Sequence, residues 1–238
     1  MSLRIITTLG LLSLAIVGMA ARSDASTVDT IPPDLSPGDT YRLVFITADT
    51  ANATSTSIAA YNTFVTDQAD DNSALAALGA TWTCICSTAT ANAVDIVGIT
   101  TSGIYTLDGN EVANGTAALF NASSTNLIDP INIDQNGDLL AGALPVWTGT
   151  LPDGSSVVGN TLGETDPVVG IASETNLDFL DEGGMGRQSS LYFYGISSEL
   201  TVPSPTPEPS TLGLSALGGA LLLLARRYKQ RNQISKGS

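Results

Sequence analysis

The chain has 238 residues, with 23 acidic side chains against nine lysines and arginines, and its formal net charge is −14. Between Ser26 and Pro207 the imbalance is larger, because 21 acidic residues face only Arg42 and Arg187, which gives −19. Such a surface repels nucleic acid, whose binding needs clustered lysines and arginines. The absence of histidine excludes a Ser-His-Asp triad, a Cys-His pair and a histidine zinc site within this chain. We favour a solvated acidic exterior over a dedicated site for divalent cations.

The first 25 residues predict a secretory signal peptide. Arg4 supplies the positive charge, residues 5–17 form the apolar core, and small residues follow. We favour cleavage after Ala25 over cleavage after Ala20 or Ala21, because small residues occupy both key positions before that bond. The apolar run is too short to span a bilayer comfortably, so a cleaved signal is favoured over a retained membrane helix.

The region after residue 203 has three parts: a proline-rich spacer, an apolar run at 212–225 and a cluster of basic residues. As a helix, the run of about 14 residues reaches roughly 21 Å, which is short of the roughly 30 Å hydrocarbon core. Basic side chains beside an apolar helix stay on the cytoplasmic side. The basic residues expected to stop translocation are Arg226, Arg227, Lys229 and Arg231. This pattern predicts a transient membrane anchor that leaves the preceding chain outside.

The order Pro-Glu-Pro, apolar helix, arginine cluster closely resembles the PEP-CTERM sorting signal of exopolysaccharide-producing Gram-negative bacteria. In that family an exosortase, a membrane-embedded cysteine protease, recognises the Pro-Glu-Pro. The resemblance implies that Pro207, Glu208 and Pro209 are the recognition residues and that the helix and basic tail are removed. Residues 232–238 extend past the last arginine and depart from the family's pattern. The alternative is an ordinary single-pass anchor with an accidental Pro-Glu-Pro.

Residues 38–202 are long enough for a single domain with one core. Residues 41–47 have the aromatic and β-branched content of a buried first strand. Apolar side chains then recur at helical spacing, which predicts a helix that Thr56 or Ser57 caps. These apolar residues are Ile58, Tyr61, Phe64 and Val65.

A polar cluster is expected to end this helix. It consists of Asp67, Asp70 and Asp71, with Asn72 beside them. A second short turn over 73–78 is predicted to close at Gly79. We favour capping of this second turn by the carboxylates over cation binding, because the helix dipole favours negative charge there.

Short strands and turns are predicted beyond Gly79. The strands are expected within 81–87, 104–107, 146–149 and 191–202. The dipeptides Asp108-Gly109, Asn136-Gly137 and Asp153-Gly154 indicate turns that need a positive φ. The interval 151–190 is rich in glycine, has little periodicity and predicts a loop.

Cys84 and Cys86 are the only cysteines, and they lie two apart in an alternating segment that places both on one face of a strand. Adjacent cysteines on one face do not easily form a disulfide, so we predict two small buried side chains. An oxidised pair in an exported chain, and metal binding with help from another chain, are the alternatives.

Two sets of oxygen ligands are candidate cation sites. Residues 134–138 carry oxygen-bearing side chains at alternate positions, as a calcium-binding loop does. Leu139 and Pro145 stand where such a loop needs glycine and glutamate, so a β-turn is predicted instead. Loop carboxylates could form a cation site or the acid/base pair of a glycoside hydrolase, although we favour solvated side chains. These are Glu164, Asp166, Glu174, Asp178, Asp181 and Glu182. Glycosylation sequons at Asn52, Asn114 and Asn121 are interpreted as chance matches in a Thr- and Asn-rich chain.

The order of these elements, with motifs at 105–109, 130–137, 146–154 and 191–194, resembles a bacterial secreted domain of C-type-lectin-like, endostatin-like architecture. The resemblance covers most of 38–202. It implies a single α+β domain with one main helix, a short second helix, small antiparallel sheets and a long irregular loop. The calcium-binding Glu-Pro-Asn, Gln-Pro-Asp and Trp-Asn-Asp motifs of sugar-binding lectins are missing from the sequence, so the fold does not imply a lectin.

Together these observations predict an exported, exosortase-sorted protein of the cell surface or extracellular matrix, with a structural or interaction role in the exopolysaccharide layer. We expect no enzymatic activity, cofactor or metal site. The expected partners are the exosortase, the membrane during sorting, and polysaccharide or divalent cations, but not nucleic acid. The alternatives are a module that binds a glycan or small ligand through 151–190 and, more weakly, a carboxylate-dependent hydrolase. The predicted organisation is a signal peptide at 1–25, a leading segment at 26–37, an ectodomain at 38–202, a linker at 203–211, a transmembrane helix at 212–225 and a cytoplasmic tail at 226–238.

Overall fold

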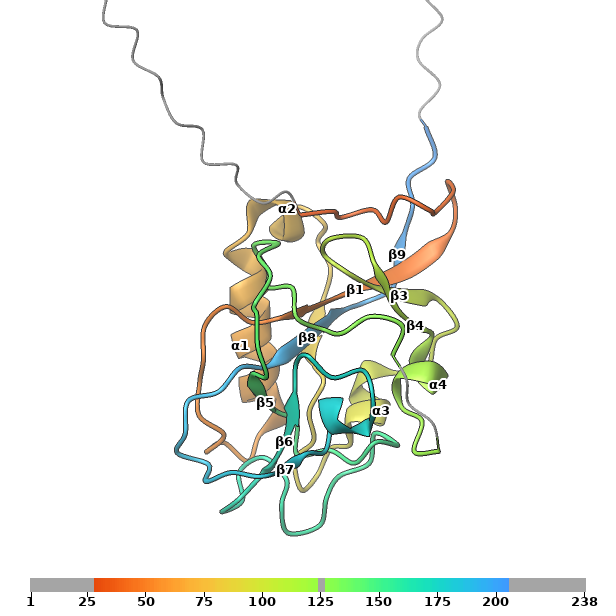
Figure 1. The fold of residues 1–238 in the computed structure, drawn as a ribbon. Helices are drawn as coiled ribbons and strands as arrows, with labels where there is room; N and C mark the ends of the chain where they lie inside the picture. Colours follow the sequence, from red (N-terminus) through yellow and green to blue (C-terminus); the bar gives the residue numbers. More distant parts are fainter. Residues whose placement is uncertain (1–27, 124–126, 206–238) are drawn as a thin grey trace, which may run out of the picture.

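Short helices and two small sheets form a mixed α+β fold in the computed structural model, which describes residues 28–123 and 127–205 (Figure 1). The α+β class predicted from the sequence is therefore confirmed. In chain order the elements are β1 (Thr40–Ile46), α1 (Ile58–Asp70), α2 (Ser73–Ala76), β2 (Trp82–Cys84), α3 (Ala93–Val97), β3 (Gly103–Thr106), β4 (Glu111–Asn114), α4 (Thr116–Leu119), β5 (Pro145–Trp147), β6 (Val168–Ile171), η1 (Leu177–Phe179), β7 (Gly183–Gly184), β8 (Tyr194–Ser197) and β9 (Leu200–Thr201).

Strand β1 is the centre of the main sheet, whose order is β2-β8-β1-β3-β4, with β9 also paired to β1. It runs parallel to β3 and antiparallel to β8, so the last part of the domain returns beside the first. Side chains alternate across a strand, and both faces of β1 are buried. Phe45 belongs to the core cluster shared with α1, whereas Val44 and Ile46 belong to a second cluster on the opposite face. The predicted buried first strand is confirmed.

Helix α1 lies against one side of this sheet with the apolar face that its sequence predicts. Tyr61, Val65 and Ala69 are buried, and Ile58 and Phe64 pack against the same core cluster. Ser57 holds the N-cap position, but its side chain makes no capping hydrogen bond.

Helix α2 follows α1 directly and has a different cap from the one predicted. The side-chain oxygen of Asn72 accepts a hydrogen bond from the backbone nitrogen of Ala74 at 2.9 Å. The prediction that aspartates cap this helix is therefore wrong, because the capping residue is Asn72. The neutral amide at the N-cap position is the group within reach of the free backbone N–H.

The region predicted as one long loop, 151–190, contributes two strands, β6 and β7, to a second sheet that also contains β5. Strand β6 pairs with both β5 and β7, and η1 lies between β6 and β7 in the chain. The prediction of a structureless 151–190 is wrong because β7 is formed by Gly183 and Gly184, which have no side chains to produce a periodic pattern. The short elements α3, β4 and α4 were also not predicted.

The two ends of the described domain lie at the same end of the molecule in Figure 1. At the start, the backbone nitrogen of Asp29 donates to Leu107 O at 2.7 Å. At the finish, Val202 N donates to Asp39 O and Val202 O accepts from Gly38 N, each at 2.9 Å. Val202 is buried and the residues immediately after it are exposed. The packed part of the domain therefore closes at Val202.

Candidate functional site

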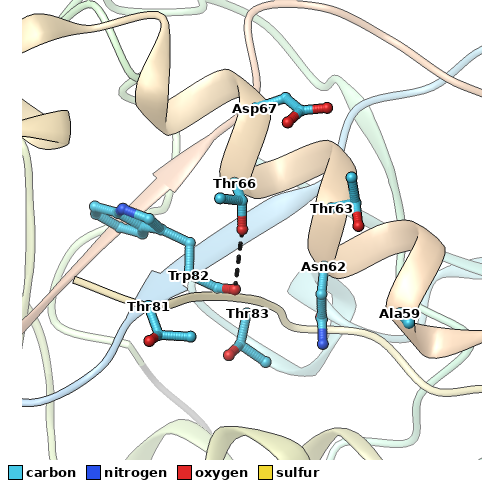
Figure 2. A pocket seen from close by; sticks show the side chains of 8 residues that line it. All are labelled: Ala59, Asn62, Thr63, Thr66, Asp67, Thr81, Trp82 and Thr83. Carbon is cyan, nitrogen blue, oxygen red and sulfur yellow. Dashed lines mark hydrogen bonds between the residues drawn. The ribbon is translucent and has the colours of Figure 1, made fainter. Parts of the chain in front are cut away.

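A groove of about 360 Å³ runs between helix α1 and strand β2 (Figure 2). Most of the lining residues are polar by type, and threonine is the commonest of them. The lining residues are Ala59, Asn62, Thr63, Thr66, Asp67, Thr81, Trp82 and Thr83. Because this volume lies within the range of small-ligand sites, the groove is the candidate functional site of the described domain.

The groove exists because β2 is an edge strand of the main sheet and α1 lies beside its free edge. The side-chain oxygen of Asn62 accepts a hydrogen bond from Cys84 N at 2.9 Å, and the Thr66 hydroxyl donates to Trp82 O at 3.4 Å. These two bonds occupy backbone groups that an exposed edge would offer to another chain. Polar side chains thus bridge helix and strand and leave a furrow between them.

Trp82 forms the base of the groove, and its side chain packs into the core. Trp82 is only 2% exposed, and its ring meets Phe45 edge-on with the centroids 5.1 Å apart. Its indole is therefore committed to the core and presents no open face for stacking against a ligand.

Several polar groups on the walls have no internal partner. Within residues 28–123 and 127–205, the side chains of Thr63, Asp67, Thr81 and Thr83 and the amide nitrogen of Asn62 make no hydrogen bond to the protein. Figure 2 shows Asn62, Thr63 and Asp67 on helix α1, and Thr81 and Thr83 on the segment that carries β2. The site therefore offers hydroxyl groups, one amide donor and one carboxylate to solvent or to a ligand.

Sequence reasoning missed this groove, although part of its pattern was visible. Thr63 and Thr66 are three apart on a helix, and Thr81 and Thr83 are two apart at a strand, so each pair shares one face. Nothing in the local sequence indicates that the two faces lie opposite each other.

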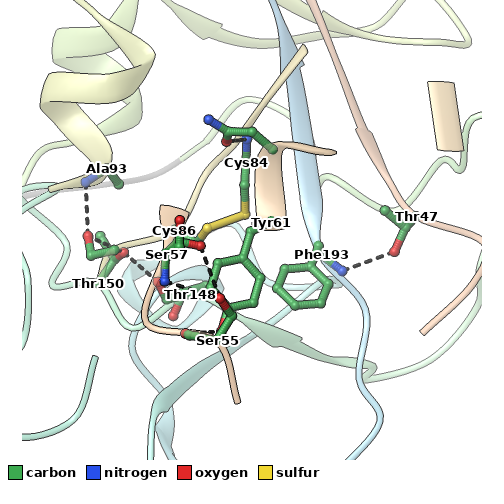
Figure 3. Close-up of a disulfide and its surroundings, with 12 residues drawn as sticks. Thr47, Ser55, Ser57, Tyr61, Cys84, Cys86, Ala93, Thr148, Thr150 and Phe193 are labelled. Carbon is green, nitrogen blue, oxygen red and sulfur yellow. Dashed lines mark hydrogen bonds between the residues drawn. A yellow bond between two sulfur atoms is a disulfide. The ribbon is translucent and has the colours of Figure 1, made fainter. Parts of the chain in front are cut away.

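Beside the groove, Cys84 and Cys86 are buried as predicted, but they form a disulfide, which is the oxidised pair that the sequence left as an alternative (Figure 3). The prediction assumed a strand through residue 87, in which residues two apart lie roughly 6.6–6.8 Å apart. Strand β2 instead ends at Cys84, and the two Cα atoms are 5.4 Å apart. This separation is within the usual range for a disulfide. Both cysteines are fully buried.

The disulfide belongs to the same core cluster as the Tyr61 ring, which stacks on Phe193 with the centroids 5.4 Å apart. The Tyr61 hydroxyl donates to Ser55 O at 2.6 Å. Burial raises the pKa of Tyr61 to about 12, so the phenol stays neutral near pH 7. These contacts fix the start of α1 beside the disulfide.

The calcium-like segment 134–138 is a turn, as predicted. One side-chain oxygen of Asp134 accepts hydrogen bonds from Asn136 N at 2.8 Å and Asp138 N at 2.9 Å. Gly137 has a φ of +82°, and the other two predicted turn glycines, Gly109 and Gly154, also have positive φ. Asp134 is buried and its oxygen serves the turn.

Two of the six loop carboxylates make local hydrogen bonds. Glu164 accepts a hydrogen bond from Thr161 N at 3.0 Å, and Glu174 accepts one from Asn176 at 3.3 Å. Burial and then the charge of Asp178 raise the pKa of Asp181. In the part of the chain that the structure describes, no group of three or more acidic, cysteine or histidine side chains is placed to hold a metal ion.

The sorting residues predicted from the sequence lie outside the described residues. They are Ala25, Pro207, Glu208, Pro209, Arg226, Arg227, Lys229 and Arg231, and the expected membrane helix at 212–225 lies outside as well. Among the helices within 28–123 and 127–205, none has the length and apolar character needed to cross a membrane.

Comparison with known proteins bears on the sorting segment. No curated protein sequence matches the chain. Residues 205–230 match the family model of the PEP-CTERM protein-sorting motif. The match spans the Pro-Glu-Pro sequence, the apolar run and most of the basic cluster, which confirms the resemblance drawn from those residues. The chain therefore carries a PEP-CTERM protein-sorting motif over residues 205–230.

Proposed function

We propose that the chain is an exported protein that an exosortase processes, leaving the acidic α+β domain at the cell surface or in the extracellular matrix. The observation that carries this proposal is the position of the sorting motif. It begins at residue 205, three residues after Val202, where the packed domain closes. Cleavage near Pro209 would therefore leave every described strand and every described core residue in the mature protein.

Two further features support export. The Cys84–Cys86 disulfide is of a kind that forms and persists in oxidising compartments outside the cytosol. The predicted signal peptide would bring the chain there. A domain whose two ends lie at the same end of the molecule can remain folded while a segment after residue 205 engages the membrane.

We further propose that the mature domain has a structural or interaction role in the exopolysaccharide layer and a C-type-lectin-like architecture. The succession β1, α1, α2 and β2, with β8 returning beside β1, supports the architecture. The strongly acidic surface supports a soluble domain that remains dispersed in a hydrated matrix.

Mass spectrometry of the mature C-terminus in a producing strain tests the sorting proposal. We expect the mature protein to lack everything from near Pro209 onward. A variant with Pro207, Glu208 and Pro209 changed to alanine should keep Arg231 and stay with the membrane fraction. A matched control changes Ser204 to alanine and should be processed normally. An intact Arg231 on the mature unaltered protein would refute exosortase processing.

A further inference from the structure

We propose that the groove between α1 and β2 binds a neutral polyhydroxylated polymer, that is, a segment of an uncharged polysaccharide. This inference rests on the proposed extracellular location, because such polymers are met there. It assigns binding to the groove instead of the interval 151–190.

The hydrogen-bonding groups of the groove suit sugar hydroxyls. Thr63, Thr81 and Thr83 each present a hydroxyl that can donate and accept, and the Asn62 amide nitrogen can donate. Asp67 adds an acceptor on the helix side. A sugar ring carries several groups that both donate and accept, so it can pair with such a mixed set.

The charge of the groove excludes an anionic polymer. Asp67 is the one ionisable side chain in the lining, and no lysine or arginine is present there. Both arginines of the described domain are used elsewhere, since Arg42 donates to Val97 O and Arg187 donates to Gly163 O, each at 2.7 Å. A uronate or sulfate would therefore meet a carboxylate and a net negative domain with no compensating cation.

The shape of the groove favours a chain segment over an enclosed small molecule. Figure 2 shows that the lining residues come from one helix and from one strand that passes beside it, and the pocket between them is open to solvent. Its volume of about 360 Å³ is near the lower end for ligand sites. A polymer can pass along such a furrow, and each of its repeat units offers the same kind of hydroxyl groups to the walls.

The groove is also preorganised. Asn62 and Thr66 hold the helix to the strand, and Trp82 anchors the floor in the core. Little ordering is then needed on binding, which reduces the entropic cost of association.

Affinity electrophoresis of the purified full chain in mild detergent tests this proposal. The probes are gels that contain dextran or galactomannan as neutral polymers and alginate as an anionic polymer. We expect a neutral polymer to retard the protein and alginate to leave its mobility unchanged. The variant Thr63→Val/Thr83→Val removes two hydroxyls while keeping side-chain shape. It should weaken binding about ten- to thirty-fold.

The matched control is Thr90→Val/Thr165→Val, which changes two exposed threonines outside the groove lining. It should bind like the unaltered protein, and equal thermal unfolding of both variants shows that they are folded. Retardation by neither neutral polymer, retardation by alginate instead, or equal binding by the two double variants would overturn the proposal. The binding assay uses purified, unprocessed protein, so a negative binding result would not bear on exosortase processing. Likewise, finding an unprocessed C-terminus in cells would not bear on the binding result.

Discussion

Removing the Cys84–Cys86 disulfide should lower the free energy of unfolding of the domain. Two contributions can be measured separately: the chain entropy that the bridge removes from the unfolded state, and the burial of its sulfur atoms. The bridge closes a loop of only three residues, for which the chain-entropy relation gives about 1.6 kcal/mol at 25 °C. Reduction of the unaltered protein should remove this part alone. The variant Cys84→Ala/Cys86→Ala also removes two fully buried sulfur atoms, each worth about 0.8 kcal/mol if it counts as a buried methylene. Its total loss is then about 3 kcal/mol.

Thermal unfolding measures these losses. For a domain of this size, one kcal/mol shifts the Tm by about 2–4 °C, so reduced protein should unfold about 3–6 °C lower and the alanine variant about 6–12 °C lower. Because both sulfur atoms are fully buried, a mild reductant should act only after the domain has opened. Native protein should therefore keep its Tm when reductant is added shortly before the scan, while protein refolded in reductant should not.

Thiol counting decides whether the bridge exists in the exported protein. After denaturation without reductant, a maleimide reagent should add no mass, and after reduction it should add two equivalents. Two reactive thiols before reduction would refute the disulfide and the export argument that uses it. An unchanged Tm after refolding in reductant would refute the assigned energy while leaving the bridge intact.

Two other residues give sharp predictions. Hydrogen bonds, first from Ser102, hold the pKa of the Glu199 carboxyl below its ordinary value of 4.5. The ionised Glu199 therefore stabilises the fold at pH values above its pKa in the unfolded chain, and this contribution is lost as the pH falls through its pKa in the folded protein. The variant Ser102→Ala should raise the folded-state pKa of Glu199 in an NMR titration. An unchanged folded-state pKa would contradict the assignment. In the second sheet, a Cβ on Gly170 would overlap the backbone carbonyl of Phe179, so Gly170→Ala should destabilise by about 1–3 kcal/mol in urea unfolding. Gly183→Ala is the control, because its Cβ would meet nothing within 4 Å; equal losses for both would contradict the steric reason.

The parts of the fold that were predictable are those in which burial leaves a regular pattern in one segment. Residues 41–47 are buried on both faces and form a nearly continuous run rich in aromatic and β-branched residues, whereas the helix around Tyr61 and Val65 buries one face and shows helical spacing. The second sheet could not be predicted in this way. Its pairing joins Val169 to Gly183 across a long stretch of chain, and glycine contributes no side-chain pattern to either face.

The disulfide and the groove could not be predicted from the sequence for a different reason. Their chemistry depends on where a strand ends and which faces meet, and neither is encoded within a few residues. Cys86 can reach Cys84 because the strand stops at Cys84, and a stop two residues later would hold the sulfur atoms on an extended backbone. The threonine pairs on α1 and β2 are visible in the sequence, but their opposition follows from how the helix covers the sheet edge.

Protection of that edge and formation of the groove have one physical cause. An exposed strand edge must be covered to prevent association with other chains, and an apolar helix face would cover it without leaving a furrow. The chain instead uses Asn62 and Thr66, whose polar ends reach the backbone of β2 and keep the helix at a distance. The remaining space is then lined by the neighbouring threonines. A substitution that packed α1 tightly onto β2, such as Thr66→Leu, should therefore fill the groove and weaken polymer binding even if the sheet edge remained covered.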